Sequence, residues 1–312
     1  MTGKVYDLLI IGGGFAGTAL AYSAARRGIH VLLLEAGSLC SGSSAACCGR
    51  AQIIESESAD LDLVLAGFSK LEDLGSELEI DLEWELPGHI TLLSSQDQWQ
   101  QYKALTGRLN QHGVEAEMLD LPSLHAAEPN LYLEGLIGAA YSKEGHLNPF
   151  KFCLGFAQAA KRLGAILLPY NPVIGFEQDY NRITGVRTET SQFSANTILL
   201  AAGAWTGKLA KMAGSSLPVC FNHAEAMVSE PLPPRIHHHI GMSGFYEAVH
   251  GNQRMVSLGV GQHRNGSLVI SNAIEQAHEI SMDSSTWSME GRRPSPTSTS
   301  EGRRIAGRGS DS

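Results

Sequence analysis

The sequence predicts an α/β fold in which a first part built on parallel strands is followed by a second, strand-rich part. The first observation is the unbroken apolar run at 5–11, which is typical of a strand buried on both faces. The second is the glycine-rich turn at 12–17, which leads into an alanine-rich helix predicted over 15–27. The third is another apolar run, at 29–34, which ends in Glu35. Together these elements make a βαβ unit of the Rossmann type, which binds a dinucleotide.

Each part of this unit has a separate physical task. Gly12 permits the tight turn, Gly14 lets the backbone approach a pyrophosphate, and Gly17 lets the helix pack closely on the strand. The helix N-terminus offers free N–H groups and the positive end of a dipole to the phosphates. Glu35 lies 18 residues after Gly17, near the spacing of a carboxylate that accepts the ribose hydroxyls. Such an acid disfavours the 2′-phosphate of NADP.

The remaining elements are predicted from periodicity, caps and breakers. Helices are predicted over 59–79, 96–112, a short stretch capped by Asp120, 148–162 and 204–213. Strands are predicted near 88–95, 135–142, 165–168, 172–178, 183–189 and 193–201. Four antiparallel strands are expected after them, near 217–229, 237–250, 254–261 and 266–271. An antiparallel second sheet is therefore expected to follow the nucleotide-binding part.

Composition and charge exclude several classes of protein. The chain has 312 residues and a net charge of −9, which argues against nucleic acid as a partner. The apolar stretch 5–25 contains Asp7 and a triple glycine, which fit a nucleotide-binding strand and turn and do not fit a signal peptide. No other run reaches the roughly 20 apolar residues of a transmembrane helix. We expect a soluble protein of the cytoplasm.

Clusters of cysteine and histidine invite metal sites, but their spacing argues against them. The five cysteines are an odd set without the spacing of a disulfide scaffold. Cys40, Cys47 and Cys48 include an adjacent pair, which is poor geometry for one iron–sulfur cluster. The three histidines at 237–239 would alternate faces on a strand and could not all reach one ion. We expect no metal, and a polar edge strand at 237–239.

A second nucleotide element lies far along the chain, where the apolar strand 197–201 ends in Ala202-Gly203-Ala204-Trp205. With this turn the chain resembles the D-amino-acid oxidase (DAO) superfamily of FAD-dependent oxidoreductases. The resemblance is to the branch of glycine oxidase, sarcosine oxidase, and opine or hydroxyproline dehydrogenases, including the B subunit of opine oxidase. The matching segments are 7–17, 34–37, 41–46, 145–149, 201–205, and His223 with 226–231. FAD is the cofactor that this resemblance implies.

The resemblance assigns cofactor roles to residues in these segments. Ser43 and Ser44 would meet the phosphates or the ribityl chain, with a solvated loop as the alternative. Trp205 would line the cofactor, with a simple core residue as the alternative. The residues implied to hold FAD are Gly12, Gly14, Phe15, Ala16, Gly17, Glu35, Ala36, Ser43, Ser44, Val173, Ala202, Gly203 and Trp205.

The implied chemistry is oxidation of the C–N bond of a small amino acid or secondary amine of the glycine, sarcosine, opine or hydroxyproline type. Hydride would pass to flavin N5, and the protein would supply binding and orientation. No catalytic residue is identified. Candidates for holding the substrate carboxylate are Arg50, His223, His250 and Arg254. The segment 223–231 resembles heteromeric oxidases most, which implies a subunit of a larger dehydrogenase that passes electrons to a partner.

The domains implied by the resemblance are discontinuous. Residues 1–85 and 145–215 would form a GR2-like FAD-binding domain, and residues 86–144 and 216–280 a substrate domain. Residues 281–312 are rich in Ser, Arg, Gly, Pro and Thr, so a disordered or aberrant tail is expected and the C-terminal part is atypical or truncated. Two other functions stay open, an FAD-dependent 2-hydroxy-acid dehydrogenase and a non-catalytic remnant that binds flavin without turnover.

Overall fold

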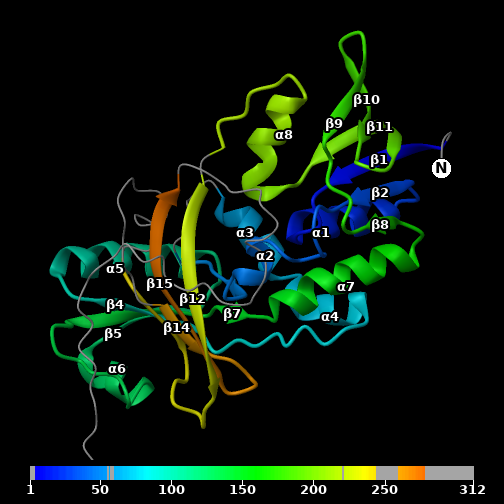
Figure 1. Cartoon of the computed structure of the whole chain (residues 1–312). Coiled ribbons are helices and arrows are strands. Elements are labelled where there is room, and N and C mark those ends of the chain that lie inside the picture. Colours follow the sequence, from blue (N-terminus) through cyan, green and yellow to red (C-terminus); the bar gives the residue numbers. More distant parts are fainter. Residues whose placement is uncertain (1–3, 55, 57–59, 220, 244–258, 278–312) are drawn as a thin grey trace, which may run out of the picture. The chain divides into compact units, whose positions relative to one another are not determined.

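The computed structural model describes residues 4–54, 56, 60–219, 221–243 and 259–277, and Figure 1 shows their arrangement. A six-stranded sheet has the strand order β8-β2-β1-β11-β10-β9. Its parallel strands are β1 (Val5–Ile11), β2 (Val31–Leu34), β8 (Ile166–Leu168) and β11 (Gln192–Leu200). The antiparallel hairpin of β9 (Gly175–Asp179) and β10 (Arg182–Arg187) extends it at one edge. The predicted α/β class is confirmed.

A second sheet has seven strands in the order β12-β15-β14-β13-β4-β6-β5. They are β4 (His89–Leu93), β5 (Ala116–Leu119), β6 (Gly138–Ser142), β12 (Phe221–Pro231), β13 (His239–Met242), β14 (Gly259–Gln262) and β15 (Ser267–Ala277). The long strands β12 and β15 lie side by side in Figure 1. A separate ladder pairs β3 (Arg50–Ala51) with β7 (Gly145–His146). Each large sheet therefore takes its strands from two separated stretches of chain.

The six-stranded sheet is buried on both faces, as its unbroken apolar strands predict. Ile10 of β1 points to the face covered by α1 (Phe15–Ala25), α4 (Leu71–Leu78) and α7 (Pro149–Arg162). Leu9 and Ile11 point to the other face, where α8 (Thr206–Met212) contributes Leu209. Figure 1 shows α7 and α8 on opposite sides of these strands. Because neighbouring side chains alternate between faces, β1 contributes to the hydrophobic core on each side of the sheet.

Helix starts follow from the capping residues. The Asp120 side chain accepts a hydrogen bond from Ser123 N at 2.9 Å and starts α6 (Leu121–Ala127), so the predicted cap is confirmed. Asn148 accepts bonds from the first-turn N–H groups of α7, and Pro149 occupies the first helical position. Ser95 starts α5 (Gln96–Gln111) with a capping box. These local signals fix where helices begin, independently of their tertiary contacts.

Three secondary-structure predictions need correction. The helix predicted over 59–79 is two helices, α3 (Leu61–Phe68) and α4, separated at Ser69 and Lys70. The strand β5 was not predicted; its central Glu117 is exposed and the strand lies at the edge of its sheet. The later strands were expected to be antiparallel, yet β13 runs parallel to β4. Apolar residues continue at helical spacing across the break, although α3 and α4 pack into different cores, so periodicity does not reveal it. Strand direction depends on partners far away in sequence.

The predicted edge strand at 237–239 is also wrong. Of these three histidines only His239 belongs to β13, and β13 lies inside the sheet between β14 and β4. His239 is buried, and its imidazole lies against Gly261 of β14, where a Cβ would collide with the ring. A buried histidine is accommodated here because its neighbour has no side chain. The expected tail, 281–312, lies outside the described residues.

Candidate functional site

The carboxyl ends of the parallel strands meet at one edge of the six-stranded sheet. Gly12 follows β1, Glu35 follows β2, Val173 lies shortly after β8, and Ala202 follows β11. β2 pairs with one side of β1 and β11 with the other, so the chain leaves β1 at a topological switch point. Ligands of open α/β sheets bind in the crevice at such a point. The structure therefore brings the sequence-predicted nucleotide segments together at one edge.

The turn between β1 and α1 depends on glycine. Gly12 has a φ of +115°, and a Cβ there would collide with the Ala201 carbonyl. A Cβ on Gly17 would collide with the Gly12 carbonyl, so glycine allows α1 to pack against the turn. Within the described part of the chain, a Cβ on Gly14 would have only the Ser44 side chain within 4 Å. A side chain on Gly14 would therefore press on the Ser44 hydroxyl, and glycine keeps the backbone of the turn accessible beside it.

Glu35 is fastened to the glycine turn. Its Oε2 accepts a hydrogen bond from Gly13 N at 2.6 Å, and its Oε1 accepts one from Gly37 N at 2.8 Å. A carboxylate has about four acceptor positions, so each oxygen keeps room for a second donor. The two backbone bonds orient the carboxylate next to Ala36 at the strand end. Binding of the ribose hydroxyls by the remaining positions stays a prediction.

The serine-rich segment contacts the start of α1. Within α2 (Ser43–Ala46), the Ser44 hydroxyl accepts a hydrogen bond from Phe15 N at 3.0 Å, whereas Ser43 is exposed. Ser44 satisfies the first N–H group of α1, and the N-cap residue Gly14 has no side chain that could accept from the next ones, which remain directed toward an anion. Trp205, in the short helix η1 (Gly203–Trp205), is half-buried, and its ring lies 4.0 Å from a Cβ built on Gly42.

These features fit a bound dinucleotide. The glycine turn and the first turn of α1, which contains Ala16, suit a pyrophosphate, with the Ser44 hydroxyl beside them. Glu35 suits the ribose, and Val173 lies after the neighbouring strand β8. The turn after β11 brings Ala202 and the exposed Gly203 to the same edge. For each of these residues, contact with FAD remains a prediction that is based on the position of the residue in the fold.

Arg50 leads to a second polar centre that sequence reasoning missed. Its Nη2 lies 3.3 Å from Oε2 of Glu144, whose side chain is 2% exposed. The other oxygen of Glu144 accepts hydrogen bonds from the backbone N–H groups of Ile53 and Ile54 and from the Ser142 hydroxyl. A carboxylate buried with this many donors is fixed in place. No spacing in the sequence points to Glu144, because all its partners except Ser142 come from other segments.

Four histidines surround this ion pair; we call them the histidine cluster (His89, His146, His239 and His263). His146 lies opposite Arg50 in the β3–β7 ladder, and His239 lies opposite His89 across β13 and β4. His239 Nε2 and His146 Nδ1 are 2.8 Å apart, and the rings of His146 and His263 have centroids 4.4 Å apart. The cluster thus joins the small ladder to the seven-stranded sheet.

Two members of the cluster have polar neighbours at their ring nitrogens. His146 Nε2 lies 3.2 Å from Oε2 of Glu85. In the contact between His239 Nε2 and His146 Nδ1, one ring nitrogen donates and the other accepts, according to the tautomers of the two rings.

Burial keeps the cluster uncharged. It lowers the pKa of His146 to about 4. It also lowers the pKa of His239 to about 2, and a proton on His239 would in addition be repelled by one on His146 and by the charge of Arg50. Burial first and the Arg50 charge second lower the pKa of His89 well below its usual range, and burial also lowers the pKa of His263. Arg50 is therefore the permanent cation of this polar centre.

The other sequence candidates lie elsewhere. The backbone of His223 belongs to β12, while His250 and Arg254 lie outside the described residues. Among the described residues, no group of three or more His, Cys, Asp or Glu side chains is arranged to hold a metal ion. His238 instead contacts the buried Glu128, which also accepts hydrogen bonds from the backbone N–H groups of His237 and His238.

The cysteines next to the nucleotide turn are free thiols. Cys40 and Cys153 are both buried, and the Cys153 thiol donates to the Gly13 carbonyl at 3.5 Å. Contact with the Cys40 thiol, helped by the Thr18 hydroxyl, lowers the pKa of Cys153. Contact with Cys153 and burial raise the pKa of Cys40. These thiols pack beneath the turn.

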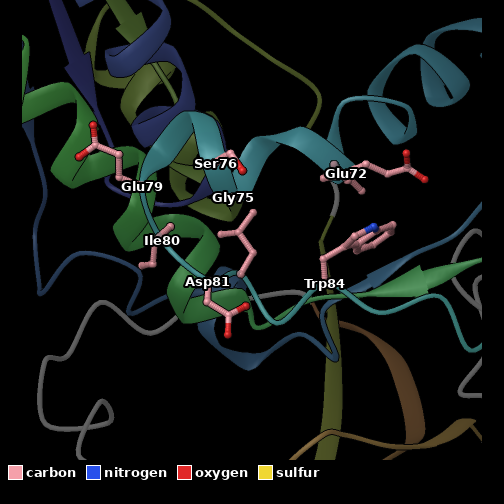
Figure 2. A pocket seen from close by; sticks show the side chains of 9 residues that line it. Glu72, Gly75, Ser76, Glu79, Ile80, Asp81 and Trp84 are labelled. Atoms are coloured by element: carbon pink, nitrogen blue, oxygen red, sulfur yellow. The ribbon is translucent and has the colours of Figure 1, made fainter.

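An open depression of about 510 Å³ lies beside α4 (Figure 2). Figure 2 shows Glu72 on the helix, Glu79 directly after its end, and Asp81 and Trp84 on the segment that runs past it. None of its lining residues belongs to the predicted nucleotide site. In the described part of the chain, no helix is long and apolar enough to cross a membrane.

The switch-point edge and its glycine turn define the class of the molecule, an α/β protein that binds a dinucleotide. The sequence then identifies the family. Residues 7–292 match the family described as FAD dependent oxidoreductase (DAO), and the chain belongs to this family. The predicted resemblance is confirmed, and FAD is the cofactor of the family.

Two relatives show how the chain compares with known proteins. Mitochondrial dimethylglycine dehydrogenase of Rattus norvegicus is 27% identical over 230 residues, which cover 73% of this chain and 27% of that protein. Glycine oxidase of Geobacillus kaustophilus is 30% identical over 243 residues, which cover 73% of this chain and 63% of that protein. The chain therefore spans about a quarter of the first relative and less than two thirds of the second.

Solved structures share the fold. Glycine oxidase from Geobacillus kaustophilus superposes with a TM-score of 0.78 at 22% identity, covering 90% of this chain and 75% of that one. L-proline dehydrogenase from P. horikoshii gives a TM-score of 0.77 at 22% identity, covering 88% and 72%. These likenesses confirm the predicted two-sheet architecture with a Rossmann-type part.

Proposed function

We propose that this chain binds FAD at the switch-point edge and oxidises the C–N bond of a small amino acid or secondary amine. The observation that carries the proposal is the convergence of Gly12, Glu35 and Ala202 at one sheet edge, in a chain of the DAO family. Relatives named dimethylglycine dehydrogenase, sarcosine dehydrogenase and glycine oxidase support a glycine- or sarcosine-type substrate. Bound flavin would accept a hydride from the carbon next to the amine nitrogen.

The chain's own residues would bind and orient. The α1 N-terminus and the backbone at Gly14 would hold the pyrophosphate, and Glu35 would hold the adenosine ribose. Arg50 would attract the substrate carboxylate, and the neutral histidine cluster would keep water and competing charge away. Residues 1–85 and 145–215 would form the FAD-binding domain, and 86–144 and 216–280 the substrate domain. The division of strands between the two sheets supports these boundaries.

We also propose that the chain works as a subunit of a heteromeric dehydrogenase of the opine-oxidase type. Support comes from β12, the outermost strand of the seven-stranded sheet, on which the apolar side chains of Met227 and Val228 are exposed. An edge strand with exposed apolar residues is suited to a partner chain. A reducing compartment such as the cytoplasm is part of this proposal, because the described cysteines are free thiols.

The absorption spectrum of the purified full chain tests the main proposal. Flavin bands are expected, and anaerobic addition of glycine, sarcosine or proline should bleach them. Bleaching by 2-hydroxy acids but not by amines would favour the hydroxy-acid dehydrogenase instead. A yellow protein that no substrate bleaches would favour the non-catalytic remnant, and a colourless protein that takes up no FAD would refute flavin binding altogether.

A further inference from the structure

We propose that Glu144 is a positioning residue, which holds Arg50 in the orientation that binds the carboxylate of the substrate. The inference rests on the proposed function and deepens it. It requires a substrate that carries both an amine and a carboxylate, and it identifies Glu144 as the group that orients Arg50.

Glu144 is a rigid anchor. Its side chain is 2% exposed, so solvent does not compete for its oxygens. Oε1 accepts hydrogen bonds from Ile53 N at 2.9 Å, Ile54 N at 2.7 Å and Ser142 Oγ at 3.0 Å. These three donors come from the segment after β3 and from the end of β6, and they leave Oε2 pointing at Arg50. Because three donors fix this carboxylate, its position determines the orientation of Arg50.

Arg50 keeps capacity for a second anion. Among the described residues, the contact of its guanidinium with Glu144 uses one nitrogen, Nη2, at 3.3 Å. A guanidinium has five N–H donors in a planar fork and suits a second, bidentate carboxylate. The side chain is 20% exposed, so a small anion can approach it while most of the stem stays packed. The histidine cluster does not compete for that anion, because burial keeps it neutral.

Unmatched polar atoms lie on the sheet face beside Arg50. His89 and Thr91 alternate with Ile90 on β4, so both point to the same face, and the charge of Arg50 acts on His89. His89 Nδ1 and Thr91 Oγ1 are buried and have no hydrogen-bond partner in the described structure. A buried polar atom without a partner costs about 1–3 kcal/mol, which a polar ligand would recover. The unpartnered Nδ1 of His89, on which the charge of Arg50 acts, therefore supports a polar ligand near Arg50.

The chain path keeps Arg50 close to the nucleotide turn. Ser44 contacts Phe15 N at the start of α1, and Arg50 lies six residues further on. Six residues span at most about 20 Å. A cofactor bound at the turn and a carboxylate bound at Arg50 are therefore compatible with one continuous site.

The test compares Glu144→Gln with Ser142→Ala. The first variant keeps the shape but removes the charge that holds Arg50; the second removes one bond to the same carboxylate and keeps the charge. Acetate and methylamine are titrated into the FAD-loaded full chain and followed by the flavin spectrum and by calorimetry. Glu144→Gln should weaken acetate binding at least about tenfold, and Ser142→Ala less than about twofold. Methylamine affinity and FAD affinity should stay unchanged in both variants.

Kinetics separate positioning from a merely structural role. For sarcosine, Glu144→Gln should raise KM with a smaller change in kcat, because a ground-state contact is lost. If Glu144→Gln fails to fold by thermal melting, Glu144→Asp, which keeps the charge but shortens the reach, is expected to give the same acetate defect in milder form. Unchanged or tighter acetate binding in a folded Glu144 variant overturns the inference while the proposed function stands. A wild-type chain that takes up no FAD overturns both.

Discussion

Acid should destabilise this protein through the histidine cluster. His146 and His239 titrate at 6.5 in an unfolded chain, but burial holds their pKa values at about 4 and about 2 in the fold. Below pH 6.5 the unfolded chain binds protons that the folded chain does not, so stability falls as the pH falls toward the folded pKa values. Above pH 6.5 both states are neutral and these groups contribute no pH dependence.

The expected magnitude follows from the two pKa differences. Between pH 8 and pH 5 each imidazole lowers the free energy of unfolding by about 2 kcal/mol, so the pair lowers it by about 4 kcal/mol. Near pH 5 the slope is about 2.5 kcal/mol per pH unit, because almost two extra protons bind on unfolding. His89 and His263 act in the same direction, and the value of about 4 for His146 already includes the opposing influence of Glu83. A loss of this size is a large part of the roughly 5–15 kcal/mol of a typical domain.

Urea unfolding measured at half-unit steps from pH 5 to pH 8 tests this expectation. His239→Asn should reduce the slope near pH 5 by about half, whatever its effect on stability at pH 8. His146→Gln is a second variant with the same expectation, and the exposed His125→Asn is the control that should keep the wild-type slope. Equal slopes for wild type and His239→Asn would show that the buried imidazoles do not govern the acid response, and the argument from burial would be wrong.

Three further outcomes are expected. Glu35→Gln should weaken FAD binding about tenfold or more in a fluorescence titration, with the exposed Glu72→Gln as control, and an unchanged affinity would remove Glu35 from the site. Gly17→Ala should lower the melting temperature, because its Cβ would collide with the Gly12 carbonyl. Gly107→Ala, in open space on α5, is the control and should raise the free energy of unfolding by about 0.5–1 kcal/mol. Equal effects of the two substitutions would contradict the packing argument. Asn148→Ala should cost about 1 kcal/mol in urea unfolding, since two first-turn N–H groups of α7 lose their acceptor, and no loss would mean that water replaces the cap.

The nucleotide half of the molecule was predictable because its signals are local. Strand, glycine turn, helix and acid occur within residues 5–35, and each is dictated by its own backbone and packing needs. The caps at Asp120 and Asn148 were predictable for the same reason, since a cap and its helix are neighbours in sequence. The turn after β11 needed the family resemblance in addition, because an apolar strand followed by small residues is common.

The polar centre around Arg50 was not predictable in this way. Glu144 binds donors about 90 positions earlier in the chain, and His239 meets His146 from a distant strand. Such contacts leave no periodicity or spacing. The adjacent histidines at 237–239 drew attention as a surface feature, whereas only their sheet partners show that His239 is buried. The register between strands that are distant in sequence cannot be read from the sequence alone.

The pairing of β1 with β11 sets an order of events during synthesis. Val5 of β1 lies beside Ser194 of β11, so these partners leave the ribosome 189 residues apart. At about 5–20 residues per second, β1 waits roughly 10–40 s for that neighbour. During this time one edge of an apolar strand is open to other chains. The nucleotide-binding edge therefore begins to form with β1, but it can be completed only when β11, 189 residues later, has been translated.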